Sequence, residues 1–175
     1  MKNKLIFVTM FLFSLGSRAE FVTSIGANNV FEREAYATQY SSRTPLAIRF
    51  GYQEFSNSIF AEYNQFYAND SIPQVSISRT QHEVLAWVRH SFWSENPLQM
   101  YLQSAPGVQL VHVQTHILKN EQEDTSQPYL ALAIAVGVAT QIEHFRFELE
   151  FRAISSQVAA PNPTLSVGLF GGYVF

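Results

Sequence analysis

Residues 164–175, Thr164-Leu-Ser-Val-Gly-Leu-Phe-Gly-Gly-Tyr-Val-Phe175, indicate the fold of this chain more clearly than any other segment. Apolar or aromatic side chains occupy every second position, with Gly171 as the only gap: Leu165, Val167, Leu169, Tyr173 and Phe175. The intervening positions carry mainly small or mixed residues: Ser166, Gly168 and Gly172. Because successive side chains of a strand point to opposite faces, this alternation predicts a β-strand with one apolar face. At the edge of a soluble sheet such a face invites aggregation, whereas a barrel that closes inside a membrane requires it.

The first nineteen residues have the pattern of an export signal. A basic start, Met1-Lys-Asn-Lys4, precedes a mostly apolar run over residues 5–15, and Ser17-Arg-Ala19 supplies small residues at the last and third-last positions. This pattern predicts a signal peptide cleaved after Ala19. An uncleaved anchor would need roughly 20 apolar residues to span a membrane. We therefore expect residues 1–19 to be removed and residues 20–175 to form one domain. The chain has no Cys, which excludes a lipid-modified cysteine and any disulfide framework.

Composition narrows the class of the mature chain. Removal of residues 1–19 leaves eight basic side chains against fourteen acidic ones, a net charge of −6. Nucleic-acid binding therefore has no basic patch to support it. The longest apolar stretch of the mature chain, residues 130–139, is too short for a spanning helix, so any passage through a membrane would require a closed barrel. Of the 15 Phe and 8 Tyr in the full chain, 12 Phe and all 8 Tyr lie after residue 19, and they suit lipid-facing strands and interfacial aromatic girdles.

Alternation along the chain predicts eight strands, at about residues 21–29, 46–54, 59–67, 75–92, 99–118, 129–139, 145–155 and 164–175. The sequence 69–73 breaks the third strand, Pro106-Gly107 suggests a bulge or kink in the fifth, and residues 119–127 form an acidic tip. Connections at residues 55–58, 93–98 and 140–144 are shorter than the others. Short periplasmic turns and longer outside loops are typical of bacterial barrels. We predict an all-β fold, an eight-stranded, antiparallel, up-and-down transmembrane β-barrel.

The predicted strand at residues 145–155 separates charge from apolar surface. Phe145, Phe147, Leu149 and Phe151 share one face, and Arg146, Glu148, Glu150 and Arg152 share the other. In a soluble sandwich the charged face would be wet, but in an eight-stranded barrel it would line a lumen filled by side chains. Charges there must pair, because isolated buried ions are costly. We expect a lumen charge network of Arg146, Glu148, Glu150, Arg152, Arg49, Glu62, Glu83 and Arg89. The small residues at alternate positions of 131–139 would leave room for long arginine side chains.

Histidines give no metal or cofactor site in this interpretation. His112 and His116 share a strand face, but four residues of strand separate them by about 13 Å, too far for one metal ion. No phosphate-binding glycine loop or paired metal-ligand spacing occurs in the sequence. We therefore expect no metal and no cofactor.

The terminal segment resembles the C-terminal assembly signal of bacterial outer-membrane β-barrels, with Tyr173 third from the end and Phe175 last. The whole pattern resembles the small eight-stranded outer-membrane barrels of Gram-negative bacteria, the group that includes the OmpA transmembrane domain and OmpX-like proteins. This resemblance implies an outer-membrane location, contact with outer-membrane lipid and lipopolysaccharide, recognition by the barrel-insertion machinery, and a monomer. It also places the acidic loops outside the cell: Glu32, Glu34, Glu121, Glu123 and Asp124.

Three functions remain open. The first is a non-catalytic structural, envelope-integrity or surface-interaction role, and the second is a narrow channel for small solutes. The third is a lipid A-modifying hydrolase, because residues 151–162 loosely resemble the matching region of lipid A 3-O-deacylases. Those enzymes carry a His-x-Ser pair on a late strand, whereas Ser155, Ser156 and Gln157 follow Ile154 here. The catalytic residues therefore do not carry over, and we expect no enzyme activity.

Overall fold

A computed structural model describes residues 19–31, 46–72, 75–117, 120–125, 127–156 and 163–175. The predicted signal peptide lies outside the described residues apart from Ala19, and so do Glu32 and Glu34 of the acidic loops. The described chain forms nine β-strands: β1 (Glu20–Phe31), β2 (Leu46–Glu54), β3 (Asn57–Ile72), β4 (Val75–Phe92), β5 (Leu98–Ile117), β6 (Asn120–Thr125), β7 (Tyr129–Ile142), β8 (Phe145–Ser156) and β9 (Thr164–Val174). No helix in these ranges is long and apolar enough to cross a membrane.

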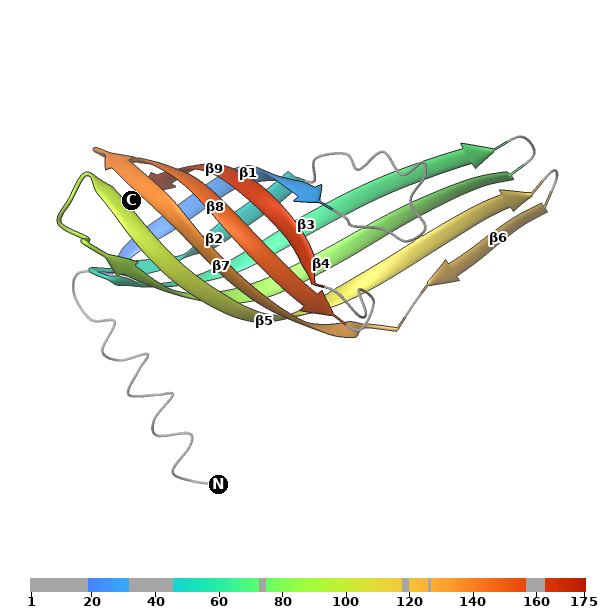
Figure 1. Cartoon of the computed structure of the whole chain (residues 1–175), viewed down its shortest axis with the longest axis horizontal. Helices are drawn as coiled ribbons and strands as arrows, with labels where there is room; N and C mark the ends of the chain where they lie inside the picture. The colour runs from blue at the N-terminus through green and yellow to red at the C-terminus, as the bar shows by residue number, and fades with distance from the viewer. Residues whose placement is uncertain (1–18, 32–45, 73–74, 118–119, 126, 157–162) are drawn as a thin grey trace, which may run out of the picture.

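The strands close into an antiparallel, up-and-down barrel (Figure 1). Apart from β6 and β7, strands that follow one another in the chain pair with each other, and β1 pairs with β9 to complete the ring. Strand β5 pairs with β7 near its start and with β6 near its end, so β6 and β7 together occupy one place in the ring. The barrel is therefore eight-stranded, and the predicted fold class is confirmed.

Alternation along the strands sorts side chains between the lumen and the outer surface. The burial of β8 changes at nearly every residue, with Arg146 buried and Phe147 exposed. Apolar side chains from six strands form a band on the outside, which we call the apolar belt, and each is 45–61 % exposed: Ile48, Phe50, Val84, Val88, Met100, Leu102, Leu132, Ile134, Val136, Phe147, Phe151 and Leu169. The same alternation of side chains along each strand places apolar residues in the belt and the intervening residues in the lumen.

Three tight turns lie at one end of the barrel, which we call the turn end (Figure 1). They connect β2 to β3, β4 to β5 and β7 to β8, and each contains a non-glycine residue with positive φ: Phe55, Trp93 and Glu143. The C-terminus lies at the same end, where the amide of Phe175 donates to the carbonyl of Phe21 at 2.9 Å. The three connections predicted to be short are thus turns at a single end.

Beyond the other end, β3 to β6 continue as a sheet that we call the arm: residues 66–72 of β3, 75–82 of β4, 111–117 of β5 and all of β6 (Figure 1). The predicted break at residues 69–73 is wrong, because β3 remains paired with β4 as far as Ile72. The predicted acidic tip is also wrong in part, since Asn120–Thr125 pairs with β5 as a strand. In the arm, backbone pairing continues these strands although their apolar and polar side chains no longer alternate.

The predicted bulge at Pro106 is wrong as well. Leu85 pairs with Gly107 and Val88 with Ser104, so the register between β4 and β5 has no extra residue. The ladder lacks pairs only at the two positions between them, next to Pro106. Because proline has no N–H to donate, it weakens the ladder there. Its side chain is exposed on the outer surface.

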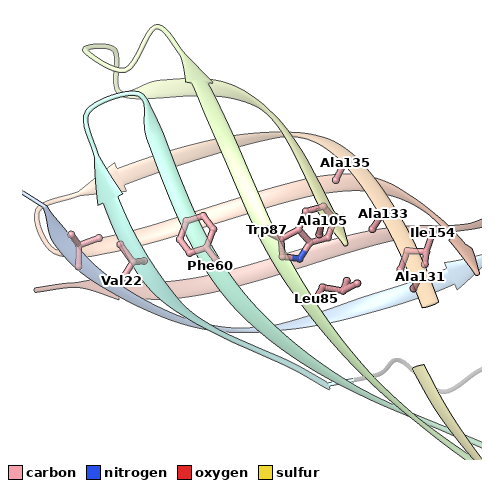
Figure 2. Packing of buried hydrophobic residues seen from close by; sticks show 10 residues of the cluster. Val22, Phe60, Leu85, Trp87, Ala105, Ala131, Ala133, Ala135 and Ile154 are labelled. Carbon is pink, nitrogen blue, oxygen red and sulfur yellow. The ribbon is translucent and has the colours of Figure 1, made fainter. Parts of the chain in front are cut away.

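The lumen contains a small apolar cluster beside its polar centre (Figure 2). Trp87 and Leu85 of β4 lie among the alanines of β5 and β7, and all of these side chains are at most 7 % exposed. The cluster consists of Val22, Phe60, Leu85, Trp87, Ala105, Ala131, Ala133, Ala135, Ile154 and Val174. The remaining interior is largely polar.

Candidate functional site: the charged lumen

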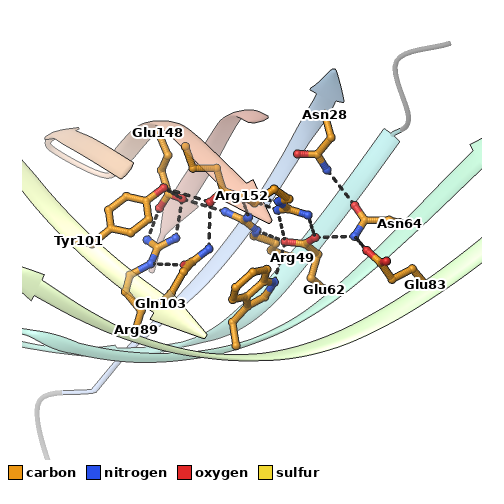
Figure 3. A network of polar contacts seen from close by, with 12 residues as sticks. Asn28, Arg49, Glu62, Asn64, Glu83, Arg89, Tyr101, Gln103, Glu148 and Arg152 are labelled. Carbon is orange, nitrogen blue, oxygen red and sulfur yellow. Dashed lines mark hydrogen bonds and ion pairs between the residues drawn. The ribbon is translucent and has the colours of Figure 1, made fainter. Parts of the chain in front are cut away.

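The structure places all eight predicted network residues inside the barrel. Their exposed fractions are 7 % or less, and they come from β2, β3, β4 and β8: Arg49, Glu62, Glu83, Arg89, Arg146, Glu148, Glu150 and Arg152. In each strand the outward alternation of apolar residues forces the intervening polar residues inward. Among the described residues, ion pairs join seven of them, all except Glu83. Figure 3 shows the part of this network around Arg49, Glu62 and Glu148.

Glu148 accepts hydrogen bonds from three arginines. Arg89 binds it with both terminal nitrogens, at 2.6 and 2.7 Å. Arg49 Nη1 donates at 3.0 Å and Arg146 Nε at 2.6 Å. The fork of Arg89 matches the two carboxylate oxygens, a geometry that fixes orientation as well as distance.

A second group lies around Glu62 and Glu150. Arg152 binds both oxygens of Glu62, at 2.7 and 3.0 Å, and also pairs with Glu150. Arg49 pairs with Glu62 and donates to Glu150 at 2.6 Å. Arg49 therefore touches three carboxylates and connects β2 and β3 to β8 across the lumen (Figure 3).

Neutral side chains complete the network, and sequence reasoning missed them. Gln103 accepts from Arg89 Nε at 2.8 Å and donates to Glu150 at 3.0 Å, and the Tyr101 hydroxyl donates to Glu150 at 3.1 Å. Trp87 Nε1 donates to Glu62 at 3.0 Å. Each of these residues lies an even number of positions from another inward-facing residue of its own strand. This alternation is the sequence signal that would have placed them in the lumen.

Glu83 stands apart from the ion pairs. Among the described residues its partners are two amides: Asn64 Nδ2 donates at 2.9 Å, and Gln109 Nε2 donates to the other oxygen. Asn64 and Gln109 are its register partners on either side. Glu83 is fully buried where the arm begins.

Aromatic rings and a glycine shape the space for the arginines. The guanidinium of Arg49 lies 3.4 Å from the Phe170 ring centre, and that of Arg89 lies 3.8 Å from the Tyr101 ring centre. Gly137 of β7 faces Tyr101, and a Cβ at this position would collide with the end of the tyrosine ring. The small residues of β7 thus give room to Tyr101, which in turn lies beneath an arginine.

The network fills the lumen with mutually bound charges. In the described part of the chain, no group of three or more His, Asp or Glu could hold a metal ion.

The described histidine contacts outside the lumen include His82 with Tyr63 at 2.7 Å and His112 with Thr125 at 2.7 Å.

The two residues of the predicted assembly signal lie at the turn end. Tyr173 lies 5.5 Å from the His144 ring and 4.8 Å from the Phe175 ring, between ring centres. Phe175 is 65 % exposed on the outer surface. Their role in assembly stays a prediction.

No family model and no curated protein matches this sequence. Solved structures do match. A major outer membrane protein from Thermus thermophilus has a TM-score of 0.68 at 10 % identity, over 91 % of this chain and 100 % of that one. The N-terminal β-barrel domain of Pseudomonas aeruginosa OprF has a TM-score of 0.60 at 11 % identity, over 89 % and 97 %. Ail, the attachment invasion locus protein of Yersinia pestis, has a TM-score of 0.58 at 10 % identity, over 90 % and 97 %.

Proposed function

We propose that this chain, which has the fold of the small eight-stranded outer-membrane β-barrels, is an integral protein of the bacterial outer membrane without catalytic activity. In this proposal the belt holds it in lipid, the charge network closes its lumen, and the arm is presented outside the cell for an envelope or surface-interaction role. The observation that carries the proposal is the apolar belt around a closed barrel whose charges are paired inside.

The belt is too large for a soluble monomer. Such proteins rarely expose contiguous apolar patches larger than a few hundred Å². Here twelve large apolar side chains from six strands are each about half exposed, and they encircle the barrel. The strands of 9 and 11 residues at β2 and β9 match the roughly 9–11 residues that a tilted strand needs to cross a membrane, and β8, with 12 residues, is one residue longer. Lipid is therefore the solvent that suits this surface.

The orientation follows from the asymmetry between the two ends. Bacterial barrels keep short turns on the periplasmic side. The turn end would thus face the periplasm and the arm would face outward, in contact with lipopolysaccharide at its base. Export by residues 1–19, insertion by the barrel machinery through Tyr173 and Phe175, and a monomeric state belong to the same proposal.

A surface-interaction role is supported by the form of the arm. Its four strands continue past the belt, and their described side chains include polar groups such as Ser78, Thr80, Gln114 and Gln122. Ail, one of the similar structures, is named for attachment and invasion. An open channel receives less support, because Arg49 and its carboxylate partners bridge opposite sides of the lumen.

Cysteine labelling tests the topology, because the native chain contains no Cys. Gln122→Cys places a thiol on exposed β6, and Glu95→Cys places one in the exposed turn between β4 and β5. A large, membrane-impermeant maleimide should label Gln122→Cys on intact cells, and Glu95→Cys only after the outer membrane is opened. Labelling of Glu95→Cys alone on intact cells would reverse the orientation.

Extraction tests the membrane itself. The protein should leave the membrane fraction only with detergent, and it should migrate differently on a gel before and after boiling. A protein that is soluble and monomeric in buffer without detergent would contradict the proposal and favour a secreted β-sheet protein.

A further inference from the structure

The ion pairs of the lumen carry a surplus of positive charge. They join four arginines (Arg49, Arg89, Arg146, Arg152) to three glutamates (Glu62, Glu148, Glu150). Glu83, the fourth glutamate, interacts electrostatically with Arg152 and so offsets charge at the arm side of the network. Six residues of β4 separate it from Arg89 by about 20 Å, so it does not offset charge at the turn end. The surplus is therefore expected toward the turn end.

Arg146 is the arginine at which the surplus is least compensated. Arg49, Arg89 and Arg152 each use all three guanidinium nitrogens in hydrogen bonds. Arg146 donates from Nε to Glu148 at 2.6 Å and from Nη1 to Gln53, but its Nη2 is buried without a partner among the described residues. Its single carboxylate is shared with Arg49 and Arg89.

A second unpaired donor lies next to the same site. Ser58 is 3 % exposed, and its hydroxyl has no partner among the described residues. Ser58 is the register partner of Gln53, which binds Arg146. Opposite residues of an antiparallel pair have Cβ atoms about 4.5–5.5 Å apart. Gln53 itself is partly exposed, and it lies next to the turn that joins β2 to β3.

We propose that the turn end of the lumen binds a small anion, such as chloride, between Arg146 Nη2 and the Ser58 hydroxyl. Buried donors without partners call for a bound water or ion. A water molecule would satisfy their hydrogen bonds, but only an anion also cancels the surplus charge, and an uncompensated buried charge is strongly destabilising. This site is independent of the surface role proposed for the arm.

Chloride dependence of thermal unfolding tests the site. The purified barrel in a neutral detergent is unfolded over a series of chloride concentrations, with gluconate making up constant ionic strength at one pH. We expect the unfolding temperature to rise with chloride and to saturate. Ser58→Ala should weaken chloride binding and so raise the half-saturating chloride concentration about tenfold, the effect of losing one hydrogen bond to a charged group. Ser166→Ala, which removes a buried serine hydroxyl from β9, is the matched control and should leave it unchanged.

Bromide gives a direct readout on the native chain if the Ser58 variant fails to fold. Crystals grown with bromide in place of chloride should show an anomalous peak within hydrogen-bond distance of Arg146 Nη2 and Ser58 Oγ. The absence of that peak, or equal unfolding temperatures in chloride and gluconate, would overturn the proposal and leave water at the site.

Discussion

Strands β3, β4 and β5 run through both the barrel and the arm, yet their side chains follow different rules in the two regions. In β4, residues 83–92 alternate strictly between buried and exposed, whereas residues 75–82 are all half-buried. The hydrogen-bond ladder with β3 nevertheless continues without a break from Asn57 to Ile72. Backbone pairing alone thus maintains the arm, while the lumen also depends on which side chain faces which. A continuous strand can therefore pass from a region where the side chains specify the structure into one where many sequences would be tolerated.

The largest effect is expected from breaking one charge in the lumen. Glu148→Ala removes the common acceptor of Arg49, Arg89 and Arg146. It therefore leaves buried cations without their carboxylate, which should lower the free energy of unfolding by about 3–5 kcal/mol. Asp124→Ala, at an exposed position of the arm, should change the free energy of unfolding by less than about 0.5 kcal/mol. Urea unfolding from detergent or lipid measures both. Similar values for the two variants would mean that the lumen charges are in contact with bulk water.

A charge on the belt is expected to have the next largest effect. Ile134 of β7 is 55 % exposed in the middle of the belt, and Ile134→Arg should cost about 2–4 kcal/mol in a lipid bilayer. Gln122→Arg on the arm serves as its control and should be nearly neutral. The comparison is made by refolding into vesicles. If Ile134→Arg is tolerated as well as Gln122→Arg, the belt does not lie in hydrocarbon.

The terminal aromatics should affect assembly more than stability. Phe175 is largely exposed, so replacing Tyr173 and Phe175 together by alanine should cost less than the roughly 1.5–3 kcal/mol of a fully buried aromatic. Before folding, however, the last strand is an unpaired edge that an insertion machine can bind by strand addition. Folded barrel per cell should fall, while refolding yield in detergent stays nearly unchanged. Normal insertion in cells would remove the assembly-signal interpretation.

The smallest effect is expected at the junction of belt and arm. The Tyr63 hydroxyl and His82 Nδ1 are 2.7 Å apart on the exposed surface. Tyr63→Phe keeps the ring and removes one hydrogen bond, which should cost about 0.5 kcal/mol. A cost of several kcal/mol in the same urea unfolding would show that this pair is desolvated and that the hydrocarbon extends further toward the arm.

The barrel itself was predictable because membrane and lumen both impose a period of two. Alternation in residues 145–155 and 164–175 was enough to assign faces, and the strand count followed from the turns. The arm was not predictable in this way. Strand β6, Asn-Glu-Gln-Glu-Asp-Thr, contains no apolar residue, so its sequence resembles a solvated loop although its backbone pairs with β5.

The network was predictable as a set of residues but not as a set of bonds. Parity identifies Arg49 and Glu150 as inward-facing, yet their contact joins residues 101 positions apart and depends on how far the strands are staggered around the barrel. Strand parity places Gln103 and Asn64 in the lumen, but it does not show that they join the network, because burying a neutral amide costs less than burying a charge. Their importance follows from their carboxylate neighbours in space.

The pairing of β1 with β9 also sets an order of events in time. Val22 lies opposite Val174, so the ring is completed by residues near both ends of the described chain, whereas β2–β3 and β7–β8 can form as local hairpins. Non-local pairing of this kind is slow, because it must first overcome the entropy of closing a long loop. Every partly built barrel therefore carries two open edges. The ring of the finished molecule has no open edge. This chain is therefore most exposed to misassembly in the interval before the ring closes, not in the native state.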